Sequence, residues 1–162
     1  VNKLIGNIPY NISTPIIEWI IDNKSSFDEI FLMLQKEFGE RCLAQPNTKS
    51  YGRLSIFVQC FFDVTVIREV DKSSFNPSPK VQSIFLKLTP KVSDMTPNSI
   101  LMKNLSALTR EAFSKRRKLI TNSLKSFFTE EDLVNFGIER RSRPENLSVE
   151  TYIKLAKSIQ SG

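Results

Sequence analysis

Hydrophobic and polar positions alternate along the first part of the chain in a pattern that predicts strands and helices in turn. Residues 1–6 form a short apolar segment that reads as a strand. It ends at Asn7-Ile8-Pro9-Tyr10, because proline cannot donate to a strand ladder and restricts the residue before it to an extended conformation. Thr14 and Pro15 then resemble an N-cap and a first helical residue, and the apolar run 16–21 predicts a largely buried helix.

Further along, residues 27–34 are almost continuously apolar, which is typical of a central parallel strand covered on both faces. A helix is expected at 36–44. The periodicity of 53–62 fits a helix or a strand, and a helical face of Leu54, Phe57, Val58 and Phe61 favours the helix. Strands are expected at 64–70 and 81–88, joined by a loop at 71–80. This alternation predicts an α/β layer across residues 1–91.

The pattern changes after residue 91. A polar linker is expected at 92–97, followed by a small all-α domain at 98–162. Thr96-Pro97, Thr129 and Ser148 are candidate N-caps for its helices, and Gly137 is a candidate helix end. Leu101, Leu105, Leu108 and Ala112 share one helical face, and a second helix is expected to carry Lys115-Arg116-Arg117-Lys118.

Charge separates the same two parts. The whole chain has a net charge of +6, and residues 97–162 hold twelve Lys or Arg and seven Asp or Glu, a net of +5. An anionic partner is therefore expected for the second part.

Composition also excludes several chemistries. The chain has no histidine, which removes imidazole acid–base catalysis, Ser–His and Cys–His pairs and the commonest metal ligand, so no metal site is expected. Cys42 and Cys60 have no CxxC spacing and are interpreted as idle thiols of a reducing compartment. No apolar run approaches the roughly 18 residues that span a bilayer. We expect a cytoplasmic monomer without membrane contact.

Asn7-Ile8-Pro9-Tyr10 follows the first strand, and sites in open parallel sheets gather at the carboxyl ends of strands. An exocyclic amine such as that of adenine is a poor nucleophile because its lone pair is delocalised. The Asn7 side-chain oxygen and a backbone carbonyl of the proline-stiffened turn are suitable acceptors that would hold the amine out of plane. Tyr10 offers a stacking face for an extracted base. The alternative interpretation is a simple strand-ending turn.

Six blocks, in this order, resemble the small-subunit rRNA adenine dimethyltransferases. They are NIPYNISTP from Asn7, QKEFGER from Gln35, YGRLS from Tyr51, FNPSPKVQS from Phe75, FSKRRKLITNSL from Phe113 and RPENLSVE from Arg143. The resemblance implies a Rossmann-like methyltransferase domain followed by a helical domain that docks on pre-ribosomal RNA. It also implies S-adenosylmethionine as methyl donor and two adjacent adenines near the 3′ end of small-subunit rRNA as substrate, modified during ribosome biogenesis.

Residue roles carry over with the blocks. Asn7 and the Pro9 carbonyl match the family's amine-holding positions, which also border the cofactor, while Tyr10 and Phe75 match its aromatic residues near the target base. The family's glycine-rich loop and the acidic residues for the cofactor precede this motif and are not in the printed chain. We therefore expect a piece of a longer enzyme that lacks most of the cofactor pocket, binds S-adenosylmethionine poorly and is inactive alone.

Two basic regions are candidates for RNA contact. Lys115, Arg116, Arg117 and Lys118 form one, and Lys49, Tyr51 and Arg53 form the other. Arg140, Arg141 and Arg143 could join them, but pairing with Glu139 and Glu145 is the favoured interpretation.

Three other functions compete with this one. The macrolide-resistance methyltransferases act on large-subunit rRNA and share the Asn-Ile-Pro-Tyr motif, but the YGRLS and RPENLS blocks disfavour them. The DNA adenine methyltransferases are disfavoured by the single proline of the motif and by the helical tail. A non-catalytic RNA-binding or transcription-factor relative is disfavoured by the intact set of Asn7, Pro9 and Tyr10.

Overall fold

The computed structural model describes residues 1–70, 82–92, 96–97 and 99–160 of the 162. The chain forms two compact units. The first contains Val1–Ala44 and Phe57–Ser93, and the second contains Gln45–Ile56 and Asp94–Gly162. Residues 45–56 thus cluster with the helical unit rather than with the sheet, and residues 92–97, expected as a linker, are divided between the two units.

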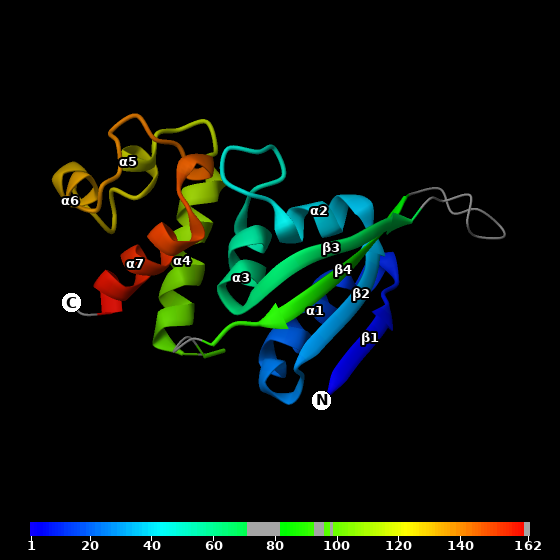
Figure 1. Ribbon diagram of the computed structural model, residues 1–162. Coiled ribbons are helices and arrows are strands. Elements are labelled where there is room, and N and C mark those ends of the chain that lie inside the picture. The colour runs from blue at the N-terminus through cyan, green and yellow to red at the C-terminus, as the bar shows by residue number, and fades with distance from the viewer. Residues whose placement is uncertain (71–81, 93–95, 98, 161–162) are drawn as a thin grey trace. The chain divides into compact units, whose positions relative to one another are not determined.

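A four-stranded sheet organises the first unit (Figure 1). Its strands are β1 (Lys3–Asn7), β2 (Glu29–Gln35), β3 (Phe62–Val70) and β4 (Ser83–Pro90), in the spatial order β1-β2-β4-β3. The β1–β2 pair is parallel, whereas β4 runs antiparallel to both β2 and β3. The carboxyl ends of β1, β2 and β3 and the first residue of β4 therefore lie along one edge of the sheet.

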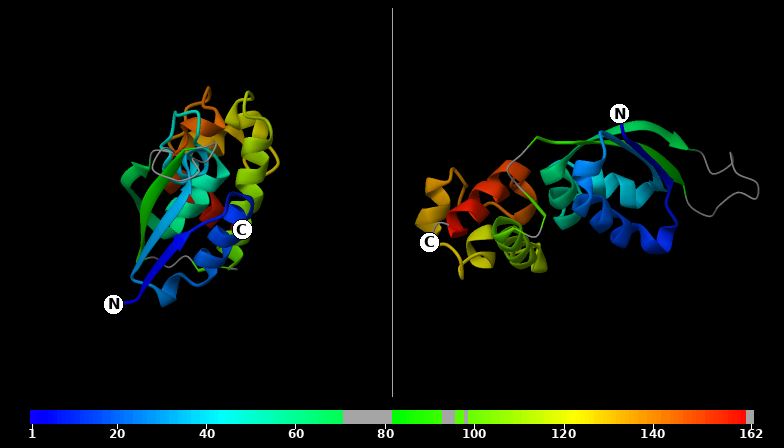
Figure 2. Two further views of the ribbon diagram at one scale, coloured as in Figure 1. Left: turned by 90° about the vertical axis from the view of Figure 1, so that its right-hand side faces the viewer. Right: turned by 90° about the horizontal axis from the view of Figure 1, so that it is seen from below.

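Helices cover one face of this sheet (Figure 2). They are α1 (Ser13–Asp22), α2 (Lys36–Leu43) and α3 (Arg53–Phe61), with 3₁₀ turns at Tyr10–Ile12 and Lys24–Ser26. On β2, Ile30, Leu32 and Leu34 are buried while the residues between them are half-buried. The expectation that this strand is covered on both faces is thus wrong for the described residues, and its continuous apolar run combines a buried face with a half-covered one.

α2 packs tightly against β4 at Gly39. A Cβ atom at this position would lie 2.2 Å from Cγ2 of Ile84, so only glycine allows the helix to approach the strand this closely. Nearby, burial raises the pKa of the Cys42 thiol from 9.0 to about 12, against a smaller opposing effect of Arg41. Cys42 and Cys60 are both buried and unbridged.

The second unit is helical. It contains α4 (Ile100–Ser114), α5 (Ile120–Ser123), α6 (Glu130–Asn135), α7 (Val149–Gln160) and a 3₁₀ turn at Pro144–Asn146. α4 packs on α7, and the four residues predicted to share a face of α4 are all buried.

Two buried tyrosines tie the second unit together. The hydroxyl of Tyr51 donates to the Leu147 carbonyl, and that of Tyr152 donates to the Pro144 carbonyl, both at 2.7 Å. Burial, with smaller contributions from Tyr51 and Glu145, holds the pKa of Tyr152 well above its ordinary value of 10.0, so its hydroxyl stays a donor. The ring of Phe113 neighbours both tyrosine rings, with centroid distances of 6.3 Å to Tyr51 and 5.9 Å to Tyr152.

Some of the predicted helix ends are confirmed and others are wrong. Thr129 caps α6 in a reciprocal pair with Asp132, Gly137 takes a positive φ of 82°, and Ser148 accepts from the Thr151 amide, as predicted. Two predicted caps are wrong. Thr14 lies inside α1, which begins at Ser13, and Ser99 rather than Thr96 caps α4 through the Met102 amide. In both places a nearby Thr-Pro pair suggested a start that the backbone does not use.

Candidate functional site

Asn7 ends β1 at the edge where the strand termini gather. It is in register with Met33 of β2, and the next amide, that of Ile8, donates to the Met33 carbonyl at 3.0 Å. Ile8 is buried and anchors the turn in the core. The side chain of Asn7 is exposed and has no hydrogen-bond partner among the described residues. The end of β1 therefore presents an open amide on a firmly held backbone.

The two carbonyls of the turn differ in their surroundings. The Pro9 carbonyl accepts from the Ile12 amide at 3.2 Å and from the Ser13 hydroxyl at 3.5 Å. The Ile8 carbonyl accepts no hydrogen bond from the described part of the chain. The sequence pointed to the carbonyl of Pro9, but local donors already occupy it. The open backbone acceptor beside Asn7 is that of Ile8.

Tyr10 lies at the same edge. Its side chain is 44% exposed, and its hydroxyl is 3.4 Å from Oγ of Ser83, which begins β4 and is itself buried. This long contact places the hydroxyl end of the ring beside β4, while part of the residue stays open to solvent.

Three of the sequence blocks meet here. Gln35 at the end of β2 is in register with Ser83, and the Lys36 amide donates to the Gln82 carbonyl at 2.8 Å. Val70, the last residue of β3, is in register with Ser83 as well. Val70 and Ser83, which flank the segment with Phe75 in the sequence, therefore both lie at this edge, and Phe75 itself is outside the described residues.

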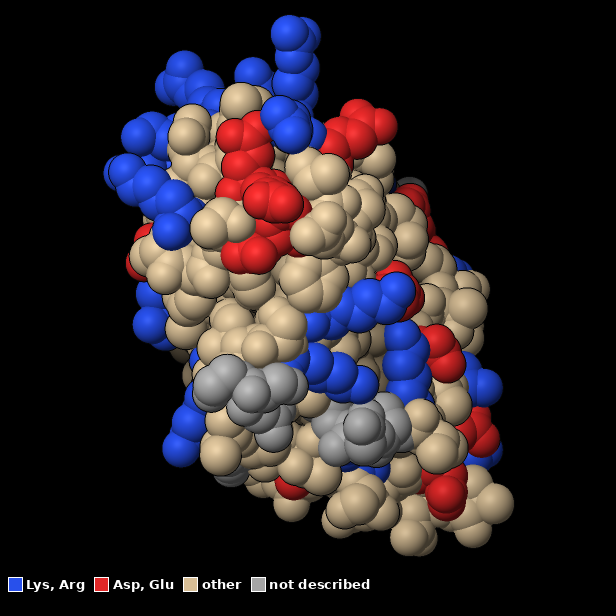
Figure 3. All heavy atoms as spheres, turned by 90° about the vertical axis from the view of Figure 1, so that its left-hand side faces the viewer, with Lys and Arg blue, Asp and Glu red and all other residues tan. Residues whose placement is uncertain are grey.

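A separate cationic surface lies on the second unit, where three loops are joined by hydrogen bonds. The Ile120 amide donates to the Ser142 carbonyl at 2.7 Å, and the Asn47 amide donates to the Glu145 carbonyl at 2.8 Å. Lys and Arg side chains gather at one end of the face shown in Figure 3, near a group of acidic side chains. We define the cationic surface by its exposed members, which are Lys49, Lys115, Arg117, Lys118, Arg141 and Arg143.

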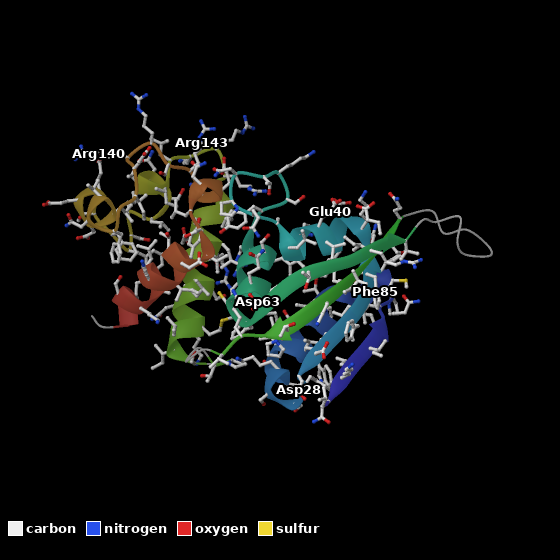
Figure 4. The ribbon with its side chains drawn as sticks, in the orientation of Figure 1. Asp28, Glu40, Asp63, Phe85, Arg140 and Arg143 are labelled. Atoms are coloured by element: carbon white, nitrogen blue, oxygen red, sulfur yellow. The ribbon has the colours of Figure 1, made fainter. Side chains whose placement is uncertain are left out.

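The pairing expected for Arg140, Arg141 and Arg143 is wrong. Arg140 pairs with Glu130, with 3.4 Å between Nε and Oε1, rather than with Glu139 or Glu145. Arg141 and Arg143 form no ion pair with any residue that the structure describes. Figure 4 shows Arg140 and Arg143 extending outward at the same end of the unit.

The sequence predicts a helix over residues 115–118, but this prediction is wrong. These residues form a turn between α4 and α5. Arg116, although exposed overall, donates from its guanidinium to the Tyr51 carbonyl and lies 5.4 Å from the ring centroid of Phe113. Arg116 therefore belongs to the packing of the unit, and it is not a member of the cationic surface.

Two further predicted RNA contacts have structural roles instead. Tyr51 is fully buried, so it cannot offer a surface to RNA. Arg53 donates to Oγ1 of Thr109 at 3.3 Å and to the carbonyl of Ser106 at 3.2 Å. Burial, and then Arg110, lower the pKa of Arg53. Both side chains hold residues 45–56 against the rest of the helical unit.

Comparison with known proteins decides the family. Residues 2–161 match the family described as ribosomal RNA adenine dimethylase. The chain belongs to this family. The match covers both the sheet and the helical unit, so neither is an unrelated addition to the other.

Among curated members of the family, the ribosomal RNA small subunit methyltransferase A of Yersinia enterocolitica is 43% identical over 160 residues, covering 98% of this chain and 58% of the relative. That of Buchnera aphidicola is 41% identical over 158 residues, covering 97% and 57%. The chain thus spans somewhat more than half the length of the curated relatives that it matches.

Solved structures agree with the fold. The crystal structure of a dimethyladenosine transferase from Plasmodium falciparum superimposes with a TM-score of 0.83 at 32% identity, covering 99% of this chain and 67% of that one. The 23S rRNA methyltransferase ErmE gives a TM-score of 0.69 at 21% identity, which shows the fold alone. The first unit is therefore part of a Rossmann-like methyltransferase fold.

Sequence reasoning about this family member missed two features of the site. Ser83 holds Tyr10, and its place at the end of the FNPSPKVQS block was the available signal. Nothing in the sequence indicates that the Ile8 carbonyl is open, because the hydrogen bonds of the following turn decide which carbonyl already has a donor. In the described ranges there is no group of three or more acidic, Cys or His residues placed to hold a metal, and no helix long and apolar enough to cross a membrane.

Proposed function

We propose that the natural full-length protein dimethylates the exocyclic amines of two adjacent adenines near the 3′ end of small-subunit rRNA during ribosome biogenesis. The family, and the names of relatives about 40% identical, support this substrate class. The observation that carries the proposal is the exposed amide of Asn7 beside the open Ile8 carbonyl, with the ring of Tyr10 held by Ser83 at the same edge. We expect the protein to act as a cytoplasmic monomer.

The chemistry at this edge fits an amine acceptor. Asn7 Oδ1 and a backbone carbonyl of the turn, that of Ile8 in preference to that of Pro9, accept the two hydrogens of the adenine amine. Holding these hydrogens away from the ring plane localises the nitrogen lone pair. The amine thereby becomes a better nucleophile, and this orientation raises the rate of methyl transfer. Tyr10 stacks on the extracted base, with Phe75 as a second aromatic contact. The ammonium formed when the amine takes up the methyl group is acidic enough to lose its proton to water, so no general base is required.

S-adenosylmethionine, when bound, supplies the electrophilic methyl group. Asn7 and Pro9 are the residues of this chain that we place beside it. The donor set fits that neighbour, because a neutral amide and backbone carbonyls orient an amino group without competing with it as nucleophiles. The role of the chain's own residues is to bind, orient and desolvate the acceptor base.

The cationic surface is proposed to dock the RNA. Its six Lys and Arg side chains come from three loops of one unit, and guanidinium and ammonium groups bind phosphate oxygens through charge-assisted contacts. None of the six forms an ion pair with an acidic residue in the described part of the chain. These side chains therefore need not break an internal ion pair before they bind RNA.

The test is methyl transfer by the full-length protein to purified small ribosomal subunits. Replacing Asn7 with Ala removes one of two amine acceptors and is expected to lower kcat by about 100-fold or more. The matched control is Asn135→Ala, an exposed asparagine of the helical unit, which should leave kcat unchanged. Equal activity of the Asn7 variant and the wild type would refute the assigned chemistry, and methylation of large subunits alone would reassign the substrate.

A further inference from the structure

A shallow pocket of about 520 Å³ lies on the second unit, and no residue of the Asn7–Tyr10 turn lines it. It is lined by the loop after α6, by Asn47, and by the first turn of α7. Its volume falls within the range of small-ligand sites. Its lining includes Phe136, whose side chain is 37% exposed, together with the charged side chains of Glu139 and Arg141.

A chain of hydrogen bonds fixes the amide donor of this pocket. The Arg143 backbone amide donates to Oδ1 of Asn146 at 2.7 Å, which sets the orientation of that side-chain amide. Nδ2 of Asn146 then donates to Oδ1 of Asn47 at 2.7 Å, which sets the next one. Nδ2 of Asn47 is left as a donor without a partner among the described residues. Because the orientation of the Asn47 amide is set before binding, a ligand that accepts a hydrogen bond from Nδ2 loses little affinity to the entropy cost of ordering this side chain.

The backbone under this donor is held as firmly. Asn47 has a φ of 69°, in the left-handed region that asparagine tolerates better than most residues. Its own amide donates to the Glu145 carbonyl at 2.8 Å. The buried hydroxyls of Tyr51 and Tyr152 fix the neighbouring carbonyls of Leu147 and Pro144. The wall of the pocket is therefore rigid before any ligand arrives.

We propose that this pocket binds one unpaired nucleotide of the RNA. The partly exposed ring of Phe136 offers a stacking surface for a base, and the guanidinium of Arg141 offers donors for its phosphate. Nδ2 of Asn47 and the Glu139 carboxylate supply one donor and one acceptor for the base edge. The side chains of Ser148 and Thr151 bind each other at 2.9 Å and are not needed for recognition.

The proposal rests on the RNA-binding function proposed above and adds a structural preference to it. Paired RNA presents phosphates but hides the faces of its bases, so the cationic surface alone binds paired and unpaired RNA alike. The pocket adds a contact that only an unstacked base can make. A preference for RNA with an unpaired base over fully paired RNA is therefore expected from the pocket but not from the cationic surface.

The experiment compares hairpin RNAs with identical stems, one fully paired and four carrying a single bulged A, G, C or U. Affinities for the full-length protein are measured by fluorescence anisotropy at one fixed salt concentration. At least one bulged hairpin is expected to bind about 5-fold or more tightly than the paired one. Asn47→Asp keeps the shape and the contact from Asn146 but removes the donor, and it should bring the ratio close to one.

Charge controls sharpen the comparison. Arg141→Ala should abolish the preference for the bulge, whereas Arg140→Ala removes the same charge from the same loop and should leave the ratio unchanged, because Arg140 pairs with Glu130 and does not line this pocket. Phe136→Leu keeps apolar volume but loses the ring and should lower the ratio, and Phe136→Trp should restore it.

Four results would overturn the proposal. Equal affinity for all five hairpins, with methylation of small subunits intact, would show that the pocket does not bind an unpaired nucleotide. The proposed function would be unaffected. A bulge preference that survives both Asn47→Asp and Arg141→Ala would place the unpaired nucleotide elsewhere. A Glu-rich peptide whose binding depends on Asn47 and Arg141, without any bulge preference, would make the pocket a protein-binding site. Failure to bind or methylate any RNA would overturn this proposal and the proposed function together.

Discussion

Arg116 and Arg117 are neighbours in the turn after α4, but their surroundings differ. Arg116 donates to the carbonyl of the buried Tyr51 and stacks on Phe113, whereas Arg117 is exposed and has no ion pair in the described ranges. A run of four cations gives no hint of this division, because the partner of Arg116 lies 65 residues away in the chain. Arg116 therefore stabilises the surface on which Arg117 is displayed.

Replacing each arginine with Ala should separate the two roles. Arg116→Ala is expected to lower the free energy of unfolding by about 1–2 kcal/mol, since it removes a charged hydrogen bond and a ring contact. Arg117→Ala should change it by less than about 0.5 kcal/mol but reduce the slope of log affinity against log salt for RNA by about one. Urea denaturation and salt titration measure the two effects. The same loss of stability in both variants would contradict the division.

The thiol of Cys42 makes a prediction about alkaline pH. Burial raises its pKa from 9.0 to about 12 in the folded chain, so the folded state holds its proton where the unfolded state has lost it. The contribution of the protonated Cys42 thiol to the free energy of unfolding is fully present below pH 9 and is lost as the pH rises from 9 towards 12. Urea midpoints measured from pH 8 to 11 should therefore fall more steeply for the wild type than for Cys42→Ala. Parallel curves would show that the thiol does not ionise differently on unfolding.

For helix α2, close approach to β4 depends on one glycine. Gly39→Ala places a methyl group against Ile84 and is expected to destabilise the chain by about 1–3 kcal/mol, despite the better helix propensity of alanine. Gly52→Ala is the matched control, because its Cβ atom would have its nearest neighbour at an ordinary 3.9 Å, Nη2 of Arg116. Thermal unfolding of both variants checks this. An unchanged midpoint for Gly39→Ala would mean that Ile84 moves aside at little cost.

Elements whose polarity pattern is local were predictable. β2, α2, α3 and β3 lie within two residues of their expected bounds, since apolar periodicity and the breaks at Gln45-Pro46 and Asp71 mark them. The antiparallel direction of β4 was not visible, because strand direction depends on which partner the strand meets. The turn at 115–118 was missed because Lys and Arg favour helices locally, while the contact of Arg116 with residue 51 favours the turn.

The candidate site shows the same limit. Asn7, Pro9 and Tyr10 were placed at a strand end from local sequence alone, and the structure puts them there. Which carbonyl is open, and what holds Tyr10, depend on Ser13 and on Ser83, the latter 73 residues away from Tyr10. Tyr51 and Arg53 were predicted as RNA contacts because their partners in the helical unit are distant in sequence.

At the scale of the whole molecule, the chain passes between the two units three times. A polypeptide of residues 94–162 alone lacks Tyr51 and Arg53, and so leaves the Leu147 and Ser106 carbonyls without their donors. It is expected to unfold at a lower temperature and less cooperatively than the same polypeptide joined to residues 45–56 through a Gly/Ser linker. Circular dichroism melts compare the two. Identical melts would show that residues 45–56 are dispensable for the helical unit.

The hydrogen bond from Tyr51 to Leu147 has a consequence for synthesis on the ribosome. The first unit has all its strands once residue 90 has been made, but Tyr51 waits for a carbonyl 96 residues further along. At about 5–20 residues per second, that wait is about 5–20 s. In the later part of this wait, after residue 90 and before residue 147, the four described strands have been made while Tyr51 still lacks the Leu147 carbonyl, and we expect residues 45–56 to be open to chaperones. Slow translation between residues 93 and 147 prolongs this exposure without disturbing the sheet.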